Sequence, residues 1–489
     1  MRTFIFLLFL YISVSVTGQS FETTLYCEEA YKAIMDLRLE DSKHWLMLEE
    51  YENPENLMPI LLSNYEDMFV AFLDEEDQDY ERYKASADRR LNRLKEAQKK
   101  GDFSSPWWHY IEAEINMHST VVKLKFGDYT SAMLNLKTAY NLLSKNQKEH
   151  PSFGPNLKSL GLIHVLIGIV PDNYQWLLSV FNLEGSVNQG LSEMEDFINK
   201  PNQLFQSETL KLYCFLIIFA DTKYNKAVSI IEKQLNPSKS MLDNMLAANI
   251  YYRLGKNNKG IDILLNEPTG TAYHHIHQNQ FMLGTLKLYR QDADADQYLK
   301  AFLDNFKGKN YVKDAYQKRA WYKWLNGDEA GYYKEMNALK SKGAKVLDCD
   351  KKAQEEAEKK VLPHVALLKA QLFFDGGYYD NSINTLDQIP IGSLTSLQQL
   401  EQTYRFARNY EGLGNNQNAI LYYQKTIENT GDCAWFCPKA ALQIGLIYER
   451  LGNKAQAKSY FKKALSYKNH IYKNGIDQQA KAGLSRIGY

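Results

Sequence analysis

The sequence has little proline, little cysteine and no excess charge of either sign, and each shortage excludes a class of protein. Its 489 residues include 12 prolines and five cysteines, and 58 Lys and Arg residues balance 58 Asp and Glu residues. This balance excludes the strongly basic profile that binding to phosphate backbones requires, so no nucleic acid partner is expected. The hydrophobic content of 45% and the aromatic content of 13% exclude a disordered chain.

Long hydrophobic runs are also scarce, and the clearest one lies near residue 1. Arg2 precedes an apolar run from Phe4 to Val16, and small residues at Val16 and Gly18 fit the positions that a signal peptidase reads. We predict a signal peptide over residues 1–18, cleaved after Gly18. The alternative, an uncleaved anchor, requires about 20 apolar residues. The mature chain, without a transmembrane segment, is expected to be exported to the periplasm or secreted, with outer-membrane association as an alternative.

No segment alternates strictly between apolar and polar residues, whereas apolar residues recur at helical spacing from Thr23 onward, so we predict an all-α chain. Three stretches share one order of small and large residues. The last stretch contains Gly445, Tyr448, Gly452, Ala457, Phe461 and Ala464. The stretch 38 residues earlier contains Ala407, Tyr410, Gly414, Ala419 and Tyr423. The stretch 37 residues earlier again contains Ala370, Phe373, Gly377 and Ser382.

This order suits two packed helices, because small residues allow the axes to approach, large rings fill the space between crossings, and a glycine ends the first helix. The pattern resembles the tetratricopeptide repeat family, whose unit is a helix-turn-helix of about 34 residues. The resemblance is clearest from Ala366 to Tyr467 and weakens upstream. It implies an α-α superhelix, or solenoid, of about ten helix pairs.

We divide the chain into regions by this resemblance. Residues 19–101 form an N-terminal helical region, residues 102–345 carry divergent repeats with an apolar insertion near 157–190, and residues 346–489 carry the clearest repeats. In the first region, 14 acidic residues between Glu40 and Glu81 precede eight basic residues between Arg82 and Lys100. Two interpretations remain open: the acidic block docks a basic partner, or the two blocks pair with each other.

If the repeats stack as in the family, the first helix of each pair lines a concave groove. When the repeats are aligned with one another, the positions of the first helix that should face the groove are Asn249, Tyr252, Phe281, Phe374, Tyr404 and Arg408. The alternative is that these aromatic residues pack between repeats because the phase differs by one residue. Members that grip a carboxylate carry a Lys where this chain has Met245, so the resemblance does not extend to that activity.

The sequence offers little chemistry beyond binding. Cys433 and Cys437 are close enough for a local disulfide, and two unrelated thiols are the alternative. His274 and His277 have helical spacing, but no third ligand accompanies them, so we predict no metal site. No phosphate-binding loop, nucleophile turn or paired-carboxylate signature appears, and we expect neither a cofactor nor catalysis.

We therefore predict an exported, non-catalytic scaffold that binds a protein or peptide through the concave face of its solenoid. Two alternatives remain open. The first is a glycan-binding protein associated with the outer membrane, because starch-capture proteins of that class are also built on tetratricopeptide helices. The second is a module that holds a metal or uses its thiols.

Overall fold

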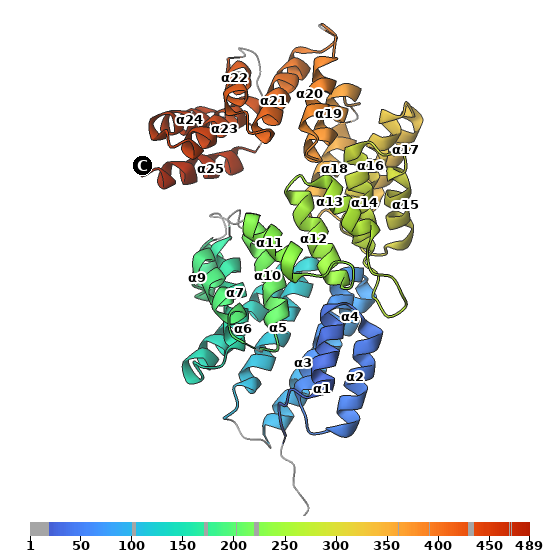
Figure 1. The fold of residues 1–489 in the computed structure, drawn as a ribbon, viewed down its shortest axis with the longest axis vertical. Helices are drawn as coiled ribbons and strands as arrows, with labels where there is room; N and C mark the ends of the chain where they lie inside the picture. Colours follow the sequence, from blue (N-terminus) through green and yellow to red (C-terminus); the bar gives the residue numbers. More distant parts are fainter. Residues whose placement is uncertain are drawn as a thin grey trace, which may run out of the picture. The chain divides into compact units, whose positions relative to one another are not determined.

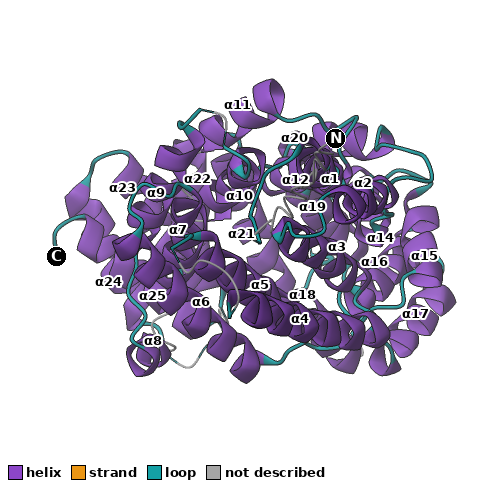
Figure 2. Ribbon diagram, turned by 90° about the horizontal axis from the view of Figure 1, so that it is seen from below, coloured by secondary structure: helices purple, strands orange, loops and turns teal. Residues whose placement is uncertain are grey.

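The computed structural model describes residues 19–99, 104–170, 175–201, 203–219, 224–359, 361–390, 392–428, 435–468, 470 and 472–489. Within these residues the regular secondary structure is helical, as Figure 2 shows, and one isolated β-bridge joins Ser20 to Asn56. The predicted all-α class is confirmed. The predicted signal peptide lies outside the described residues. None of the described helices combines the length and the apolar character that a membrane span requires.

The chain forms two compact units. The first unit contains residues 1–243 and 268–275, and the second contains residues 244–267 and 276–489. The first unit holds α1 (Leu25–Met35), α2 (Leu39–Glu52), α3 (Met58–Asp74), α4 (Asp77–Gln98), α5 (Trp107–Lys125), α6 (Tyr129–Glu149), α7 (Pro155–Gly168), α8 (Gln175–Phe181), α9 (Val187–Ile198), α10 (Gln206–Phe219) and α11 (Tyr224–Gln234). These units differ from the three predicted regions, since residue 345 lies inside the second unit.

The unit boundary falls near the start of α12 (Met241–Arg253), which lies mostly in the second unit. The other helices of this unit are α13 (Asn257–Leu265), α14 (His277–Arg290), α15 (Ala295–Asn305), α16 (Val312–Leu325), α17 (Glu329–Ser341), α18 (Asp348–Lys359), α19 (Val365–Asp375), α20 (Tyr379–Asp387), α21 (Ser396–Gly412), α22 (Asn416–Ile427), α23 (Phe436–Arg450), α24 (Lys454–Ser466) and α25 (Lys473–Arg486). Figure 1 shows that neighbouring helices lie side by side in pairs, such as α1 with α2 and α23 with α24.

The pair of α23 and α24 shows why the repeat pattern produces this fold. A Cβ atom on Gly445 would lie 2.6 Å from the Phe461 ring, so only glycine lets α23 approach α24 this closely. Gly452 follows α23 with a φ of 75°, the left-handed conformation in which glycine commonly ends a helix. Both glycines therefore act as the sequence pattern predicts, and the predicted α-α solenoid of helix pairs is confirmed.

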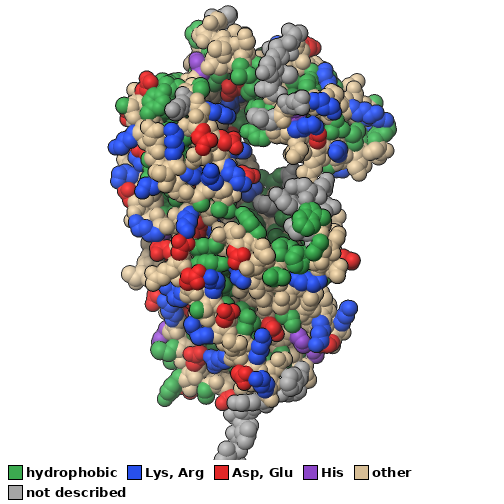
Figure 3. All heavy atoms as spheres, turned by 180° about the vertical axis from the view of Figure 1, so that it is seen from behind, with side chains coloured by type: hydrophobic (Ala, Val, Ile, Leu, Met, Phe, Trp, Pro, Cys, Tyr) green, Lys and Arg blue, Asp and Glu red, His purple; other side chains and the backbone are tan. Residues whose placement is uncertain are grey.

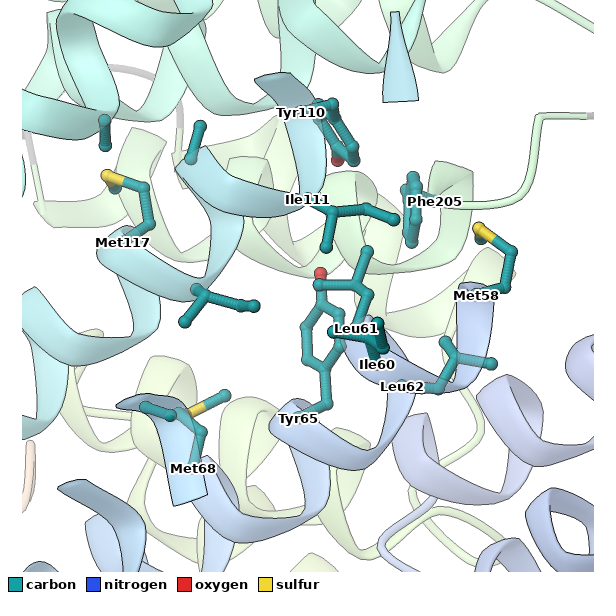
Figure 4. Packing of buried hydrophobic residues seen from close by; sticks show 14 of the residues in the cluster. Met58, Ile60, Leu61, Leu62, Tyr65, Met68, Tyr110, Ile111, Met117 and Phe205 are labelled. Carbon is teal, nitrogen blue, oxygen red and sulfur yellow. The ribbon is translucent and has the colours of Figure 1, made fainter. Parts of the chain in front are cut away.

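The core of the first unit brings together the first helices of successive pairs. Figure 4 shows Tyr65 of α3 pointing toward Ile111 of α5, with Tyr110 and Phe205 close to each other in the same cluster. The ring centroids of Tyr110 and Phe205 are 5.5 Å apart. Large rings thus fill the space at which these helices converge.

A buried ion network lies within this core. The Lys158 ammonium on α7 is 2.5 Å from a carboxylate oxygen of Glu114 on α5 and 3.0 Å from one of Glu208 on α10. Lys158 also donates to the Tyr65 hydroxyl at 2.9 Å, and Tyr31 of α1 donates to Glu208 at 3.1 Å. Each residue of this network lies on the first helix of a pair. The interior of the first unit is therefore filled by the unit's own charged and aromatic side chains.

The acidic and basic blocks of the first unit pair in part with each other. Arg90 of α4 contacts Asp67 of α3 at 2.8 Å, and Arg82 contacts Asp79. A more distant basic residue, Lys125, contacts the buried Glu75 at 2.7 Å. The contact between Arg90 and Asp67 agrees with the interpretation in which charges of adjacent helices pair with each other, and docking of a basic partner remains a prediction.

The apolar insertion contains the short helix α8, which lies between the paired helices α7 and α9 in the sequence. Leu178 and Phe181 of α8 pack against the core of the first unit. Trp176 and Val180 of the same helix are 61% and 66% exposed. The insertion is therefore only partly buried.

The second unit contains a helix outside the pairing scheme. α18 packs against α16 and α17, and α19, which follows it, packs on α14 and α16. The turns after α12 and α19 come so close that a Cβ atom on Gly377 would lie 2.0 Å from the Gly255 carbonyl oxygen. Asn257 also donates to the Tyr378 hydroxyl at 2.9 Å. These contacts bring α12, α14, α16, α18 and α19 around a common space.

Candidate functional site

The space enclosed by these helices of the second unit is a cavity of about 510 Å³. Its aromatic lining comes from Tyr252 on α12, Tyr289 on α14, Trp321 on α16 and Tyr472, which precedes α25. The rings of Tyr252 and Tyr289 stack with their centroids 6.2 Å apart. Tyr252 is 37% exposed, so a ligand in the cavity can contact its ring.

Charged side chains surround this aromatic lining. Lys318 of α16 forms an ion pair with Asp314 one turn earlier, and its ammonium lies 5.9 Å from the centre of the Trp321 ring. Burial favours the neutral amine of Lys318, but Asp314 outweighs this effect and raises the pKa of the lysine. The cavity therefore presents a fixed cation at an aromatic wall.

A half-buried carboxylate fixes α18 at the edge of the cavity. Glu356 of α18 accepts hydrogen bonds from the indole of Trp321 at 2.8 Å and from the Gln317 side chain. Burial raises the pKa of Glu356, although both hydrogen bonds lower it. A second α18 carboxylate, Asp350, accepts from the backbone amides of Tyr311 and Asp314 where α16 begins. The polar wall of the cavity is thus held by specific contacts between α16 and α18.

A second feature lies on α21 and α23, the first helices of the next two pairs. The Arg408 guanidinium stacks over the Phe374 ring of α19 at 4.7 Å and donates to the Tyr404 hydroxyl at 3.5 Å. Lys439 of α23 donates to the Gln479 side chain at 3.3 Å. Burial lowers the pKa of Lys439, and the nearby Arg408 charge lowers it further. The two cations are therefore close enough to repel each other.

Neither Arg408 nor Lys439 forms an ion pair with a carboxylate among the described residues. The Glu411 carboxylate acts on both cations without contacting either, and it instead accepts from Arg450 at 2.9 Å and from the Tyr423 hydroxyl at 2.6 Å. Partly buried cations without a counter-charge are costly, because they lose hydration without a compensating partner. This pair of cations can therefore accept an anionic group.

The cavity and the cation pair are connected through α19. Gln371 lines the cavity and accepts from the Arg405 guanidinium of α21 at 2.8 Å. Phe374, one turn later on the same helix, supports Arg408. One face of α19 thus contributes to both features.

Comparison with known families identifies the repeat. Residues 438–470 match the family described as Tetratricopeptide repeat, and this segment contains most of α23 and all of α24. The chain therefore contains a tetratricopeptide repeat at residues 438–470. Proteins built from this repeat are generally scaffolds for protein interaction rather than catalysts, and the helical repeat architecture supports that role here. A comparison with curated proteins finds no significant match.

The six predicted groove residues have different environments. Tyr252 lines the cavity, and Phe374 and Arg408 stack on each other. Phe281 and Tyr404, at 9% and 5% exposure, instead pack into cores, with Phe302 and Phe436 among their neighbours. The packing of Tyr404 on Phe436 of the next pair agrees with the alternative in which these aromatic residues pack between repeats, whereas Phe281 packs within its own pair. The half-buried Asn249 donates to the Met245 carbonyl oxygen within α12.

Several residues that line the cavity were not predicted from the sequence. Lys318 and Trp321 lie on α16, where the repeat pattern is weak, and α18 belongs to no pair. Of the predicted disulfide pair, Cys433 lies outside the described residues, and Cys437 is buried with its sulfur 3.3 Å from the Thr426 carbonyl oxygen. That disulfide remains a prediction.

Proposed function

We propose that the protein is a non-catalytic scaffold that binds an extended segment of a partner protein along one surface of its second unit. This binding surface consists of the cavity lined by Tyr252 and Trp321 together with the cation pair of Arg408 and Lys439. An aromatic cavity suits a large apolar side chain of a peptide, and such anchors carry much of the energy of protein binding.

The observation that carries the proposal is a pair of partly buried cations without a direct ion-pair partner, beside an accessible aromatic cavity. The Arg408 side chain is already ordered by Phe374 and Tyr404, so little conformational freedom is lost when an anionic group binds. We infer that the partner segment carries an acidic group about one helix pair away from an apolar anchor.

Site-specific photocrosslinking tests this proposal. A photoreactive amino acid replaces Tyr252 in one variant and the exposed Tyr129 of the first unit in a control variant. We expect a discrete partner to be captured from position 252 and not from position 129. Titration of that partner should then show at least tenfold weaker binding to Arg408→Ala, because a charge-assisted contact is worth about 1.5 to 3 kcal/mol. Equal capture from both positions, or unchanged affinity of Arg408→Ala, would contradict the proposal.

We also propose that the protein is exported and that residues 1–18 are removed. The apolar run from Phe4 to Val16 and the small residues before Gln19 support this proposal. Mass spectrometry of the mature protein should give a first residue of Gln19, and cell fractionation should recover it outside the cytoplasm. Specific retention on a glycan column together with exposure on the outer membrane would favour the glycan-binding alternative instead.

A further inference from the structure

The last helix pair and the helix that follows it are strongly basic, although the whole chain is neutral. Residues 435–489 contain ten basic residues against two acidic residues, Glu449 and Asp477, which gives this stretch a net charge of +8. Because the formal net charge of the chain is zero, the remaining residues carry −8. Charge is therefore concentrated in one part of the second unit.

Most of this positive charge lacks a counter-charge. Both arginines and one lysine are paired: Arg450 with Glu411, Arg486 with Glu449, and Lys473 with Asp477. Among the described residues, no carboxylate pairs with Lys454, Lys458, Lys462, Lys463, Lys468 or Lys481. These six lysines, called the basic surface below, are exposed except for Lys458, which is half-buried. Figure 3 shows Lys and Arg side chains gathered over this part of the molecule.

Helix geometry aligns half of the basic surface. Lys454, Lys458 and Lys462 are spaced four residues apart on α24, so they form a row along one side of the helix. Ala457, Phe461 and Ala464 form the buried side of α24, which leaves the row beside the packed face. Lys458 lies over the Tyr489 ring at 3.3 Å. The row is thus an ordered array of positive charges.

The chemistry of the basic surface indicates the class of partner. All six of its cations are lysines, which act as point charges, whereas arginine is preferred for bidentate recognition of individual phosphates. No large hydrophobic residue is exposed on α24 itself, and of the described residues only Leu451 before the helix and Tyr489 under Lys458 are exposed beside the row, so it has few of the apolar anchors that are typical of protein interfaces. An array of lysines without anchors suits a diffuse anionic surface. Each lysine near an anionic lipid surface contributes about 1 kcal/mol to binding.

We propose that the basic surface docks the protein on a membrane that contains anionic phospholipids. The attraction is electrostatic and reversible, because no apolar segment of α24 is available for insertion. It weakens as salt screens the charges. The basic surface is separate from the cavity and the cation pair, so docking does not depend on the proposed binding of a partner protein.

Vesicle co-sedimentation of the full chain tests this proposal. The probes are vesicles of phosphatidylcholine alone and vesicles of phosphatidylcholine and phosphatidylglycerol in equal parts. We expect binding to the mixed vesicles only, with the affinity falling as salt rises. The charge-reversal variant Lys454→Glu, Lys458→Glu, Lys462→Glu should bind the mixed vesicles about a hundredfold more weakly.

A matched variant controls for net charge and folding. Lys233→Glu, Lys342→Glu, Lys345→Glu reverses three other exposed lysines outside the basic surface and should retain binding. Circular dichroism should show the same helical content for both variants. Equal binding to the two kinds of vesicle, or equal loss in the two variants, would overturn the proposal. Tighter binding to a DNA duplex than to mixed vesicles, at the same phosphate concentration, would assign the surface to nucleic acid instead.

Discussion

In the first unit, a few buried charged residues form ion pairs that fill part of the solenoid interior. Lys158 is 2% exposed and lies between Glu114 and Glu208, whose carboxylates come from two other helices. Burial favours a neutral Glu114, but the Lys158 ammonium outweighs this effect and holds the pKa of that carboxyl below its usual value. Burial instead raises the pKa of Glu208, so the lysine chiefly compensates the charge of Glu114.

Replacing this lysine should destabilise the first unit strongly. In Lys158→Met, the carboxylates of Glu114 and Glu208 remain buried without a cation, and breaking a buried ion pair in this way typically costs about 3 to 5 kcal/mol. Urea unfolding followed by circular dichroism measures the loss. The triple variant Lys158→Met, Glu114→Gln, Glu208→Gln should recover most of the stability. A loss no larger than that of Lys32→Met, whose lysine side chain is 59% exposed, would show that the network is unimportant.

The pKa of the neighbouring His118 should make the stability of the first unit depend on pH. Burial lowers the pKa of His118 to about 4; Glu114 opposes this shift, and Lys158 and Arg90 add to it. The Asn64 amide donates to its ring nitrogen at 2.8 Å, as a neutral imidazole allows. Because the pKa is depressed in the folded state, the stabilisation is complete above the unfolded pKa of about 6.5 and is lost as pH falls through about 4.

We therefore expect acidification from pH 7 to pH 4 to cost about 3 kcal/mol more in the native protein than in His118→Gln. The glutamine can still accept from Asn64 but does not titrate. The measurement is the free energy of unfolding of both proteins across this pH range. Parallel pH profiles for the two proteins would contradict the assignment.

At the scale of the elements, helix pairing depends on small residues at the crossings. The crossing of α23 and α24 relies on Gly445, because a side chain there meets the Phe461 ring. Gly483 of α25 faces the same ring, and a Cβ atom on this glycine would lie 2.4 Å from it. Phe461 is thus enclosed by glycines from two helices.

Gly445→Ala should therefore destabilise the last repeat by about 1 to 3 kcal/mol, since overpacking a tight core has costs of this size. Gly475→Ala is the matched control. It lies in α25 with open space around its Cβ position, so it should stabilise that helix by about 0.5 to 1 kcal/mol. Thermal unfolding of both variants should show a lower melting temperature for Gly445→Ala and a higher one for Gly475→Ala than for the native protein. Partial rescue of Gly445→Ala by Phe461→Leu would identify the ring as the cause.

The elements also show what could be predicted from the sequence. The helix crossing at Gly445 and the turn at Gly452 could be predicted from the sequence. Both depend on residues that are close to these glycines in the chain. The environment of Tyr404 could not be predicted in the same way. An error of one residue in the assumed phase of the repeat rotates a side chain by about 100° around the helix, which moves it from the groove into the core. The part of the cavity wall that α18 forms could not be predicted, because α18 packs on α16 outside the repeat pattern.

At the scale of the whole molecule, the two compact units should respond separately to local damage. Contacts in repeat proteins are mostly between neighbouring elements, so destabilisation spreads through few repeats. The Lys158 network joins α1, α3, α5, α7 and α10, which all lie in the first unit, whereas Gly445 lies in the second.

Hydrogen exchange of the full chain should resolve this difference. Lys158→Met should speed amide exchange across the helices joined by the network and leave residues 277–489 unchanged. Gly445→Ala should do the reverse, with faster exchange in α21 to α25 and no change in α1 to α7. These patterns are expected because exchange from a partly unfolded state reports the stability of the cooperative unit that contains the amide. Uniform acceleration along the chain in either variant would mean that both units unfold as a single cooperative structure.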